Sequence, residues 1–280
     1  MASPCELFVR LPKQSDACEL IERAASEAQR IEQHFSRYRQ DNPLYRINHS
    51  GGQATALDDE YARLFEYALQ LYHLSDGQFD ISSGSLRHLW VFDAAQRQAP
   101  AAAAIDAALE LVGLARVHWQ KPWLRLPAGM QLDFGGIAKE YAVDRAAQII
   151  EQHGSADYLV NFGGDCRCRA SVTKPWRIAI ESVCEPPNND NGVTLVEGAI
   201  ATSGTTKRYF KQGGKRYGHI LDPRSGRPVE EAPLSVSVVA QTCVEAGSLS
   251  TLAMLQGANA RAFLEQQGVL HWVLRASDHS

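Results

Sequence analysis

The stretch LDFGGIAK, residues 132–139, places Gly135 and Gly136 between a predicted strand and a predicted helix. Two glycines at such a turn let the backbone approach a ligand, and the helix N-terminus offers unpaired N–H groups to an anion. Lys139 falls in the first helical turn, where the helix dipole disfavours a cation. A cation in that place indicates a bound phosphate or a carboxylate partner. The alternative is a left-handed glycine turn with a solvated lysine.

Apolar periodicity around this stretch predicts helices and strands that follow no regular βαβ order. A first helix is expected to start at a capping box formed by Asp16 and Glu19 and to run to Phe35. Further helices are expected at residues 58–74, 100–112 and 138–153, and between 245 and 267. Strands are expected at residues 6–11, 117–119, 123–126, 130–132, 158–161, 177–181, 199–202, 216–221, 234–240 and 269–274, with a surface loop at 184–192. The mixture favours an α+β fold, with one domain over residues 1–280 or two intertwined subdomains.

The composition excludes several classes of protein. Of the 280 residues, 45% are apolar and 21% are charged, and the net charge of −4 argues against a nucleic-acid partner. The longest uncharged stretch, residues 246–260, is too short and too polar to span a membrane. The six cysteines show no CxxC spacing and are expected to be reduced thiols. The N-terminus lacks signal-peptide features, so we expect a cytoplasmic protein, or a periplasmic one if a leader was removed.

A second candidate site lies in HILDPRSG, residues 219–226. A histidine at the end of a strand, here His219, can act as a general base near neutral pH. The Pro-Arg-Ser-Gly turn that follows leaves Asp222 at the exit of the strand. The alternative is a surface hairpin that carries a histidine and an aspartate by chance.

Three further polar residues stand beside glycine turns. Asp80 ends DGQFD, Asp165 ends NFGGD, and Ser203 begins Ser-Gly-Thr. Taken one at a time, each is better explained by turn chemistry than by a ligand contact. Ser203 has no GxSxG elbow, which disfavours a hydrolase, and the chain has neither a GxGxxG nor a Walker A sequence.

Taken in order, these segments resemble the ApbE family, the flavin transferases that move FMN from FAD onto a protein threonine. The resemblance extends from about residue 1 to residue 275. Six segments carry it: FSRY through Asn48, GQFD through Trp90, LDFGGIAK with YAVD, VNFGGD, ATSG and HILDPRSGRP. The resemblance implies an α+β fold with a mixed sheet and helices around a flavin-binding cleft.

The resemblance also implies residue roles. FAD would lie in the cleft with its diphosphate near Gly135 and Gly136, and Tyr38 would lie near the isoalloxazine. The polar cleft positions would be Asp80, Lys139, Asp165, Ser203 and His219. A threonine hydroxyl of an acceptor flavoprotein would attack the FMN-side phosphorus, and AMP would leave. Lys139 and a magnesium ion would neutralise the diphosphate, while His219 or the nearby carboxylate of Asp222 would take the proton.

The metal site is where the sequence departs from the family pattern. The resemblance implies three ligands: the carbonyl of Ala138, an aspartate at position 247 and the hydroxyl of Thr251. Gly247 stands in place of the aspartate, although magnesium usually needs a carboxylate. Glu140 also replaces a glycine of the family. We therefore expect Gly247→Asp to raise magnesium affinity.

Two classes of function follow from this departure. The first is a magnesium-dependent FAD:protein FMN transferase. The second is a non-catalytic FAD-binding relative that acts as a flavin carrier or partner subunit. An interaction protein that binds no flavin is a third possibility. Labelling of a threonine acceptor with FMN separates the enzyme from the others, and an FAD titration separates the carrier from the interaction protein.

Overall fold

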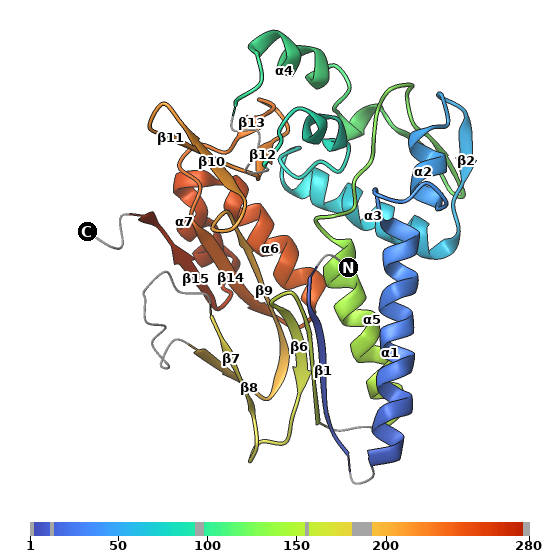
Figure 1. The fold of residues 1–280 in the computed structure, drawn as a ribbon, viewed down its shortest axis with the longest axis vertical. Coiled ribbons are helices and arrows are strands. Elements are labelled where there is room, and N and C mark those ends of the chain that lie inside the picture. The colour runs from blue at the N-terminus through green and yellow to red at the C-terminus, as the bar shows by residue number, and fades with distance from the viewer. Residues whose placement is uncertain (1–2, 12–13, 93–97, 155–156, 181–191, 277–280) are drawn as a thin grey trace.

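A six-stranded antiparallel sheet lies at the centre of the computed structural model, which describes residues 3–11, 14–92, 98–154, 157–180 and 192–276. The strand order is β1-β5-β6-β9-β14-β15 (Figure 1). The strands are β1 (Cys5–Arg10), β5 (Asp157–Phe162), β6 (Asp165–Arg169), β9 (Glu197–Gly204), β14 (Ser235–Ala240) and β15 (His271–Leu274). Strands from the two ends of the chain therefore form the two edges of one sheet.

Two helices pack on this sheet and on each other. Helix α5 (Ala138–Gln152) contacts β5 and β6, and helix α6 (Cys243–Leu255) contacts β9 and β14. Small buried residues of α6, among them Gly247 and Ser250, allow this helix to pack closely against α5 and the sheet. Helix α1 (Gln14–Phe35) packs along α5 (Figure 1). The first turns of α5 and the middle of α6 are thus held beside the central strands.

The remaining elements surround this core. Helix α3 begins immediately after Asp58, whose side chain accepts a hydrogen bond from the Tyr61 N–H at 2.7 Å. The other helices are α2 (Pro43–Asn48), α3 (Asp59–Leu74), α4 (Ala102–Leu109), α7 (Ala260–Gln267) and the short 3₁₀ helices η1 (Gly84–His88), η2 (Leu114–Arg116) and η3 (Gly257–Asn259). The small sheets comprise β2 (Ala54–Ala56), β3 (His118–Gln120), β4 (Trp123–Arg125), β7 (Trp176–Ala179), β8 (Gly192–Leu195), β10 (Tyr209–Gln212), β11 (Lys215–Gly218), β12 (Leu221–Asp222) and β13 (Arg227–Pro228).

The α+β prediction is confirmed, and the predicted helices at 58–74 and 138–153 agree with α3 and α5. Several boundaries were wrong. Helix α1 begins at Gln14, so position 16 lies inside the helix and not at its start. Helix α4 ends three residues before the predicted 112.

The predicted strand at residues 130–132 is absent from the described chain, since only Gln131 forms an isolated bridge, to Ser83. The predicted strand at 216–221 is divided between β11 and β12. The expected loop at 184–192 lies almost wholly outside the described residues.

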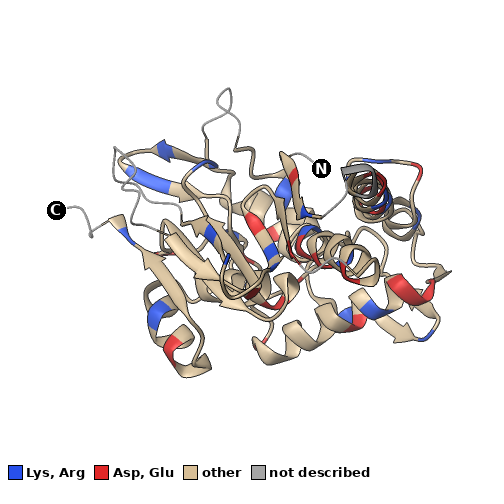
Figure 2. Cartoon of the chain, turned by 90° about the horizontal axis from the view of Figure 1, so that it is seen from below, with Lys and Arg blue, Asp and Glu red and all other residues tan. Residues whose placement is uncertain are grey.

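Basic and acidic residues are interspersed over the elements (Figure 2). Five cysteines of the described chain are free thiols: Cys5, Cys18, Cys166, Cys168 and Cys243. Within the described ranges, no helix is long and apolar enough to cross a membrane.

Candidate functional site

Helix α5 starts directly after the Gly135-Gly136 turn. The N–H of Ala138 bonds to the carbonyl of Phe134 at 2.8 Å, and no side chain among the described residues caps the helix at Ile137. Neither glycine has a positive φ angle, so the left-handed turn considered from the sequence is wrong. A Cβ on Gly135 would lie 3.0 Å from Asp133 Oδ1. A glycine suits position 135 because the turn folds tightly over the Asp133 carboxylate, which accepts the Gly135 N–H at 2.8 Å.

Lys139 lies in the first turn of α5 and has a carboxylate partner. Its Nζ contacts Asp165 Oδ2 at the start of β6. The other oxygen of Asp165 accepts a hydrogen bond from the Thr202 N–H at 3.0 Å, and Asp165 is 2% exposed. The sequence suggested either a bound phosphate or a carboxylate partner for this lysine. The structure shows the carboxylate partner, Asp165.

Ser203 and Thr251, which were predicted as separate ligands, lie together. Ser203 Oγ on β9 is 3.0 Å from Thr251 Oγ1 and 2.8 Å from Ser250 Oγ, both on α6. Ser250 Oγ in turn donates to the carbonyl of Gly247 at 3.0 Å. The pair formed by Lys139 and Asp165 is adjacent to this group through Thr202. The structure therefore gathers four of the predicted site residues around α5, β6, β9 and α6.

Glu140 fills the space in front of Gly247. A Cβ built on Gly247 would lie 2.5 Å from Glu140 Cγ, 3.1 Å from its carboxyl carbon and 3.2 Å from Oε1. Any side chain at position 247 would therefore displace Glu140. The expectation that Gly247→Asp raises magnesium affinity stays a prediction, and the structure adds a condition to it: the new carboxylate would have to share this space with the Glu140 side chain.

The Glu140 carboxylate is buried and half satisfied. Glu140 is 8% exposed, and its Oε1 lies 3.8 Å from Lys139 Nζ. Its other oxygen, Oε2, has no hydrogen-bond partner among the described residues; we call it the orphan oxygen. Burial raises the pKa of Glu140, while the charge of Lys139 opposes that rise. A buried polar atom of this kind requires an explanation, and a bound cation is one.

Asp144, one helical turn along α5, fixes the position of α6. Its Oδ1 accepts from the Cys243 N–H at 2.9 Å and from Arg167 Nη1 at 3.0 Å. Its Oδ2 accepts from the Val244 N–H at 2.9 Å. The carboxylate thus satisfies backbone donors at the start of α6, where a negative charge is favourable. This junction sets the register that brings Gly247 against Glu140.

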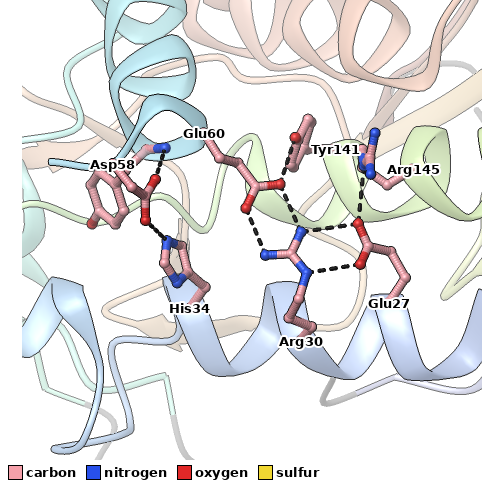
Figure 3. Close-up of polar contacts among 8 residues, drawn as sticks. Glu27, Arg30, His34, Asp58, Glu60, Tyr141 and Arg145 are labelled. Atoms are coloured by element: carbon pink, nitrogen blue, oxygen red, sulfur yellow. Dashed lines mark hydrogen bonds and ion pairs between the residues drawn. The ribbon is translucent and has the colours of Figure 1, made fainter.

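A network on a neighbouring face of α5 joins that helix to α1 and α3 (Figure 3). Arg30 bonds to Glu27 at 2.8 Å and to Glu60 at 2.6 Å. The Tyr141 hydroxyl donates to Glu60 at 2.8 Å, and Arg145 donates to Glu27 at 3.0 Å. Residues of all three helices share one set of charges, which holds the beginning of α5 in place.

Two arginines, which were not singled out from the sequence, meet on Asp133. Arg37 Nη1 and Arg87 Nε lie 2.7 and 3.0 Å from the same oxygen, Oδ2. Burial raises the pKa of Asp133, but Arg87 and Arg37 outweigh burial and hold it below its usual value. Arg37 also donates to the Tyr38 hydroxyl at 2.6 Å, and Tyr38 is 77% exposed. Arg37 stands in the quoted FSRY segment, so the motif was a signal for it.

His219 is held neutral near pH 7. Burial lowers its pKa to about 4, and the charges of Arg87 and Arg208 add to that effect. Its Nδ1 lies 3.3 Å from the carbonyl of Arg208, and its ring lies edge-on to Phe92 at 6.3 Å. The charge of Arg87, which is paired with Asp133, therefore also acts on His219.

Asp80 joins its own turn to the start of η2, and Asp222 contacts residues in its own turn. Asp80 Oδ1 accepts from the N–H of Ser82 at 2.7 Å, and its Oδ2 accepts from the N–H of Leu114 at 3.0 Å. Asp222 Oδ1 accepts from the N–H of Arg224 at 2.9 Å and also lies 3.2 Å from Arg224 Nε. Asp222 lines a hollow of about 350 Å³ together with Arg227 and Gly257. These contacts give both aspartates a role in loop structure.

Whether this site could bind a metal ion depends on the donor atoms that line it. In the described part of the chain, no three His, Cys, Asp or Glu side chains cluster as a metal site. Magnesium needs few protein ligands, because it keeps several waters and often takes one or two carboxylates. Thr251 and the orphan oxygen of Glu140 are oxygen donors of the right kind, so the residues present fit a hard cation.

The comparisons with known proteins agree along nearly the whole chain. The sequence profile of the ApbE family matches residues 1–274. The FAD:protein FMN transferase of Salmonella typhimurium is 34% identical over 80% of this chain and 67% of its own length. The enzyme of the same name from Escherichia coli K12 is 31% identical over 92% of this chain and 77% of its own length.

Solved structures show the same similarity. The ApbE protein of Thermotoga maritima superposes with a TM-score of 0.87 at 29% identity, over 97% of this chain and 90% of its own. The flavinyl transferase ApbE of Pseudomonas stutzeri in its apo form superposes with a TM-score of 0.82 at 29% identity, over 97% of this chain and 91% of its own.

Proposed function

The chain belongs to the ApbE family, and on that premise we propose that it is an FAD:protein FMN transferase. It would move FMN from FAD to a threonine of an acceptor flavoprotein and release AMP. The observation that carries this proposal is the cluster of Lys139, Asp165, Ser203 and Thr251, which lies around the first turns of α5 and the middle of α6. The relatives named FAD:protein FMN transferase support it.

FAD binding is assigned to two groups of residues. The exposed ring of Tyr38, supported by Arg37, offers a stacking surface for the isoalloxazine. Lys139, at a helix N-terminus beside Gly135 and Gly136, supplies positive charge and backbone N–H groups for the diphosphate. In this proposal Asp165 holds Lys139 in position until the diphosphate binds.

Asp80 and Ser203 have supporting positions in the same proposal. The two oxygens of Asp80 accept from the N–H groups of Ser82 and Leu114 and so join two distant segments of the chain. In this proposal Asp80 would shape the wall of the cleft. Ser203 already contacts Thr251 and would orient that hydroxyl.

Proton transfer is assigned to His219. The attacking threonine hydroxyl must lose its proton as the new phosphorus–oxygen bond forms, and a base near it speeds that step. A histidine with a pKa of about 4 is neutral at physiological pH, so its ring holds no extra proton there and can hydrogen-bond to the hydroxyl that loses one. Asp222 is three residues away and engaged with Arg224, so it is the second choice for this role.

A magnesium ion would be held between the two helices, by the carbonyl of Ala138 on α5 and the hydroxyl of Thr251 on α6. When bound, it would neutralise charge on the diphosphate and so make AMP a better leaving group. Lys139 would share that task. Ser203 would keep the Thr251 hydroxyl directed toward the site.

Incubation of the protein with FAD, magnesium and a threonine-containing acceptor tests the function. We expect mass spectrometry to find the acceptor heavier by one FMN group, with one AMP released for each acceptor modified. The matched control is the same acceptor with its threonine replaced by valine, which lacks the hydroxyl. An acceptor that stays unmodified while the protein binds FAD would contradict the transferase proposal.

The second candidate function is a non-catalytic flavin carrier. The observation that favours it is Gly247, which leaves α6 without a carboxylate at the predicted metal position. A carrier would bind FAD, shown by quenching of flavin fluorescence, and release no AMP. A flat FAD titration would rule out both candidates.

A further inference from the structure

The side chain of Glu140 and the glycine at position 247 face each other across the α5–α6 contact. Glu140 lies on α5, one residue after Lys139 and two after Ala138. Gly247 lies on α6, one helical turn before Thr251, so positions 247 and 251 share a helix face. Glu140 occupies the space into which a side chain at position 247 would extend. Its carboxylate is therefore presented to the same face as Thr251.

The described residues give this buried carboxylate only part of the hydrogen bonds that it needs. Taking a carboxylate out of water costs several kcal/mol unless it is paired and hydrogen-bonded. Lys139 is shared with Asp165 and lies 3.8 Å from Oε1, beyond hydrogen-bond distance. The orphan oxygen has no partner anywhere in the described residues. An apolar residue or a glutamine at position 140 would avoid this cost, so the carboxylate points to a ligand.

We propose that Glu140 is the carboxylate ligand of a divalent cation bound between α5 and α6 with Ala138 and Thr251. The carboxylate comes from α5 in this chain, and the glycine at position 247 makes room for it. Neither position can change alone: a side chain at 247 collides with Glu140, and loss of Glu140 leaves the site without a carboxylate. The inference rests on the proposed function, because it concerns the metal that the transferase would use.

Manganese binding tests this inference without using transfer activity. Mn²⁺, which has a similar preference for oxygen ligands, would be titrated against the wild type and Glu140→Gln, with the free ion measured by electron paramagnetic resonance. We expect Glu140→Gln to weaken Mn²⁺ binding at least about tenfold, and Mg²⁺ to compete with Mn²⁺ in the wild type. Gln keeps the shape of the side chain and removes a buried charge, so the variant should fold.

Two further variants complete the design. Glu245→Gln is the matched control, since Glu245 is an exposed acid at the start of the same helix α6, and it should leave Mn²⁺ affinity unchanged. The double variant Glu140→Gly with Gly247→Asp moves the carboxylate from α5 to α6 and should restore affinity to within about threefold of the wild type. Thermal melting of each variant reports whether it is folded.

The outcomes separate this inference from the proposed function. Unchanged Mn²⁺ affinity in Glu140→Gln, undetectable binding in the wild type, or a folded double variant that binds no better than Glu140→Gln would each overturn the inference. FMN transfer by the wild type would stand in all three cases. Conversely, an acceptor that is never labelled would remove the transferase function, while a loss of Mn²⁺ binding in Glu140→Gln would still establish the cation site.

Discussion

Two carboxylates of helix α5 lie one turn apart, are equally buried, and have opposite surroundings. Asp144 is 6% exposed and Glu140 is 8% exposed. Asp144 receives two backbone N–H groups of α6 and the guanidinium of Arg167. Glu140 has one distant lysine and an orphan oxygen. The same helix face therefore carries one carboxylate that is satisfied by the protein and one that is not.

The difference separates what holds the fold from what awaits a ligand. Hydrogen bonds to a charged, buried group stabilise a structure only when all its partners are present. Asp144 has its full set within the chain, so it joins α5 to α6. Glu140 lacks part of its set among the described residues, and we assign the missing partner to the proposed cation. Substitutions at the two positions should then have different consequences.

The largest expected effect is on stability, from Asp144→Asn. The substitution leaves Arg167 facing a neutral group and places an amide NH₂ near the N–H groups of α6. We expect the free energy of unfolding to fall by about 3 kcal/mol, on the scale measured when one partner of a buried charge pair is removed. Urea denaturation monitored by tryptophan fluorescence gives the value.

The matched variant for this comparison is Glu140→Gln. Without a metal, it should change the free energy of unfolding by less than about 1 kcal/mol or increase it, because it removes a poorly paired buried charge. Equal losses of stability in the two variants would contradict the difference drawn between Asp144 and Glu140, since Glu140 would then be a structural residue like Asp144.

The next effect, on rate, is expected from His219→Ala. Loss of a general base lowers the transfer rate roughly 10²-fold, which corresponds to about 2.7 kcal/mol in the barrier. FAD affinity should change little, because His219 is assigned to the proton and Tyr38 and Lys139 to the flavin. Rates of AMP release at saturating FAD provide the measurement. His88→Ala, on η1, is the control, and it should transfer FMN at the wild-type rate.

The pH dependence of FMN transfer by the wild type tests whether His219 is neutral in the working enzyme. The pKa of His219 in the folded protein is about 4, against about 6.5 for an unperturbed histidine. The side chain therefore stays neutral at pH values well below 6.5. The kcat/KM for transfer should therefore stay level as the pH falls through 6.5. An acid limb centred near 6.5 would mean that His219 does not have the environment described here.

Much of the site could be predicted because local spacing determines it. Lys139 follows the Gly135-Gly136 turn by three residues, so a correct helix start places it in the first turn. Thr251 follows Gly247 by one helical turn. The predicted strand at residues 130–132 failed for a different reason: a buried apolar loop has the same alternation as a strand, and only the hydrogen bonds distinguish them.

The relation between Glu140 and Gly247 could not be predicted, because it depends on tertiary packing. Each residue looked like a separate departure from the family pattern. Only the register between α5 and α6, set by Asp144 at the start of α6, brings the two positions into contact. The paired arginines on Asp133 are a similar case, since Arg37 and Arg87 come from distant segments.

The smallest expected effect concerns Glu60, the carboxylate of α3 that is paired with Arg30 and Tyr141 (Figure 3). The hydrogen bond from Arg30 lowers the pKa of Glu60 to about 2, against the opposing effect of burial, and Tyr141 assists. A lowered folded-state pKa adds stability that is present above the unfolded value of about 4.5 and is lost as the pH falls toward 2. Because this network is partly open to solvent, we expect Glu60→Gln to cost on the order of 1 kcal/mol at pH 7.

The difference in unfolding free energy between the wild type and Glu60→Gln should shrink as the pH is lowered from 5 to 2, as measured by urea denaturation at each pH. Asp59→Asn is the matched control, because Asp59 lies in the same first turn of α3 and its side chain is 78% exposed beside Lys121. That variant should stay within about 0.5 kcal/mol of the wild type throughout. A pH-independent gap for Glu60→Gln would show that its cost comes from lost packing and not from charge, and would place Glu60 outside the class of satisfied carboxylates that Asp144 represents.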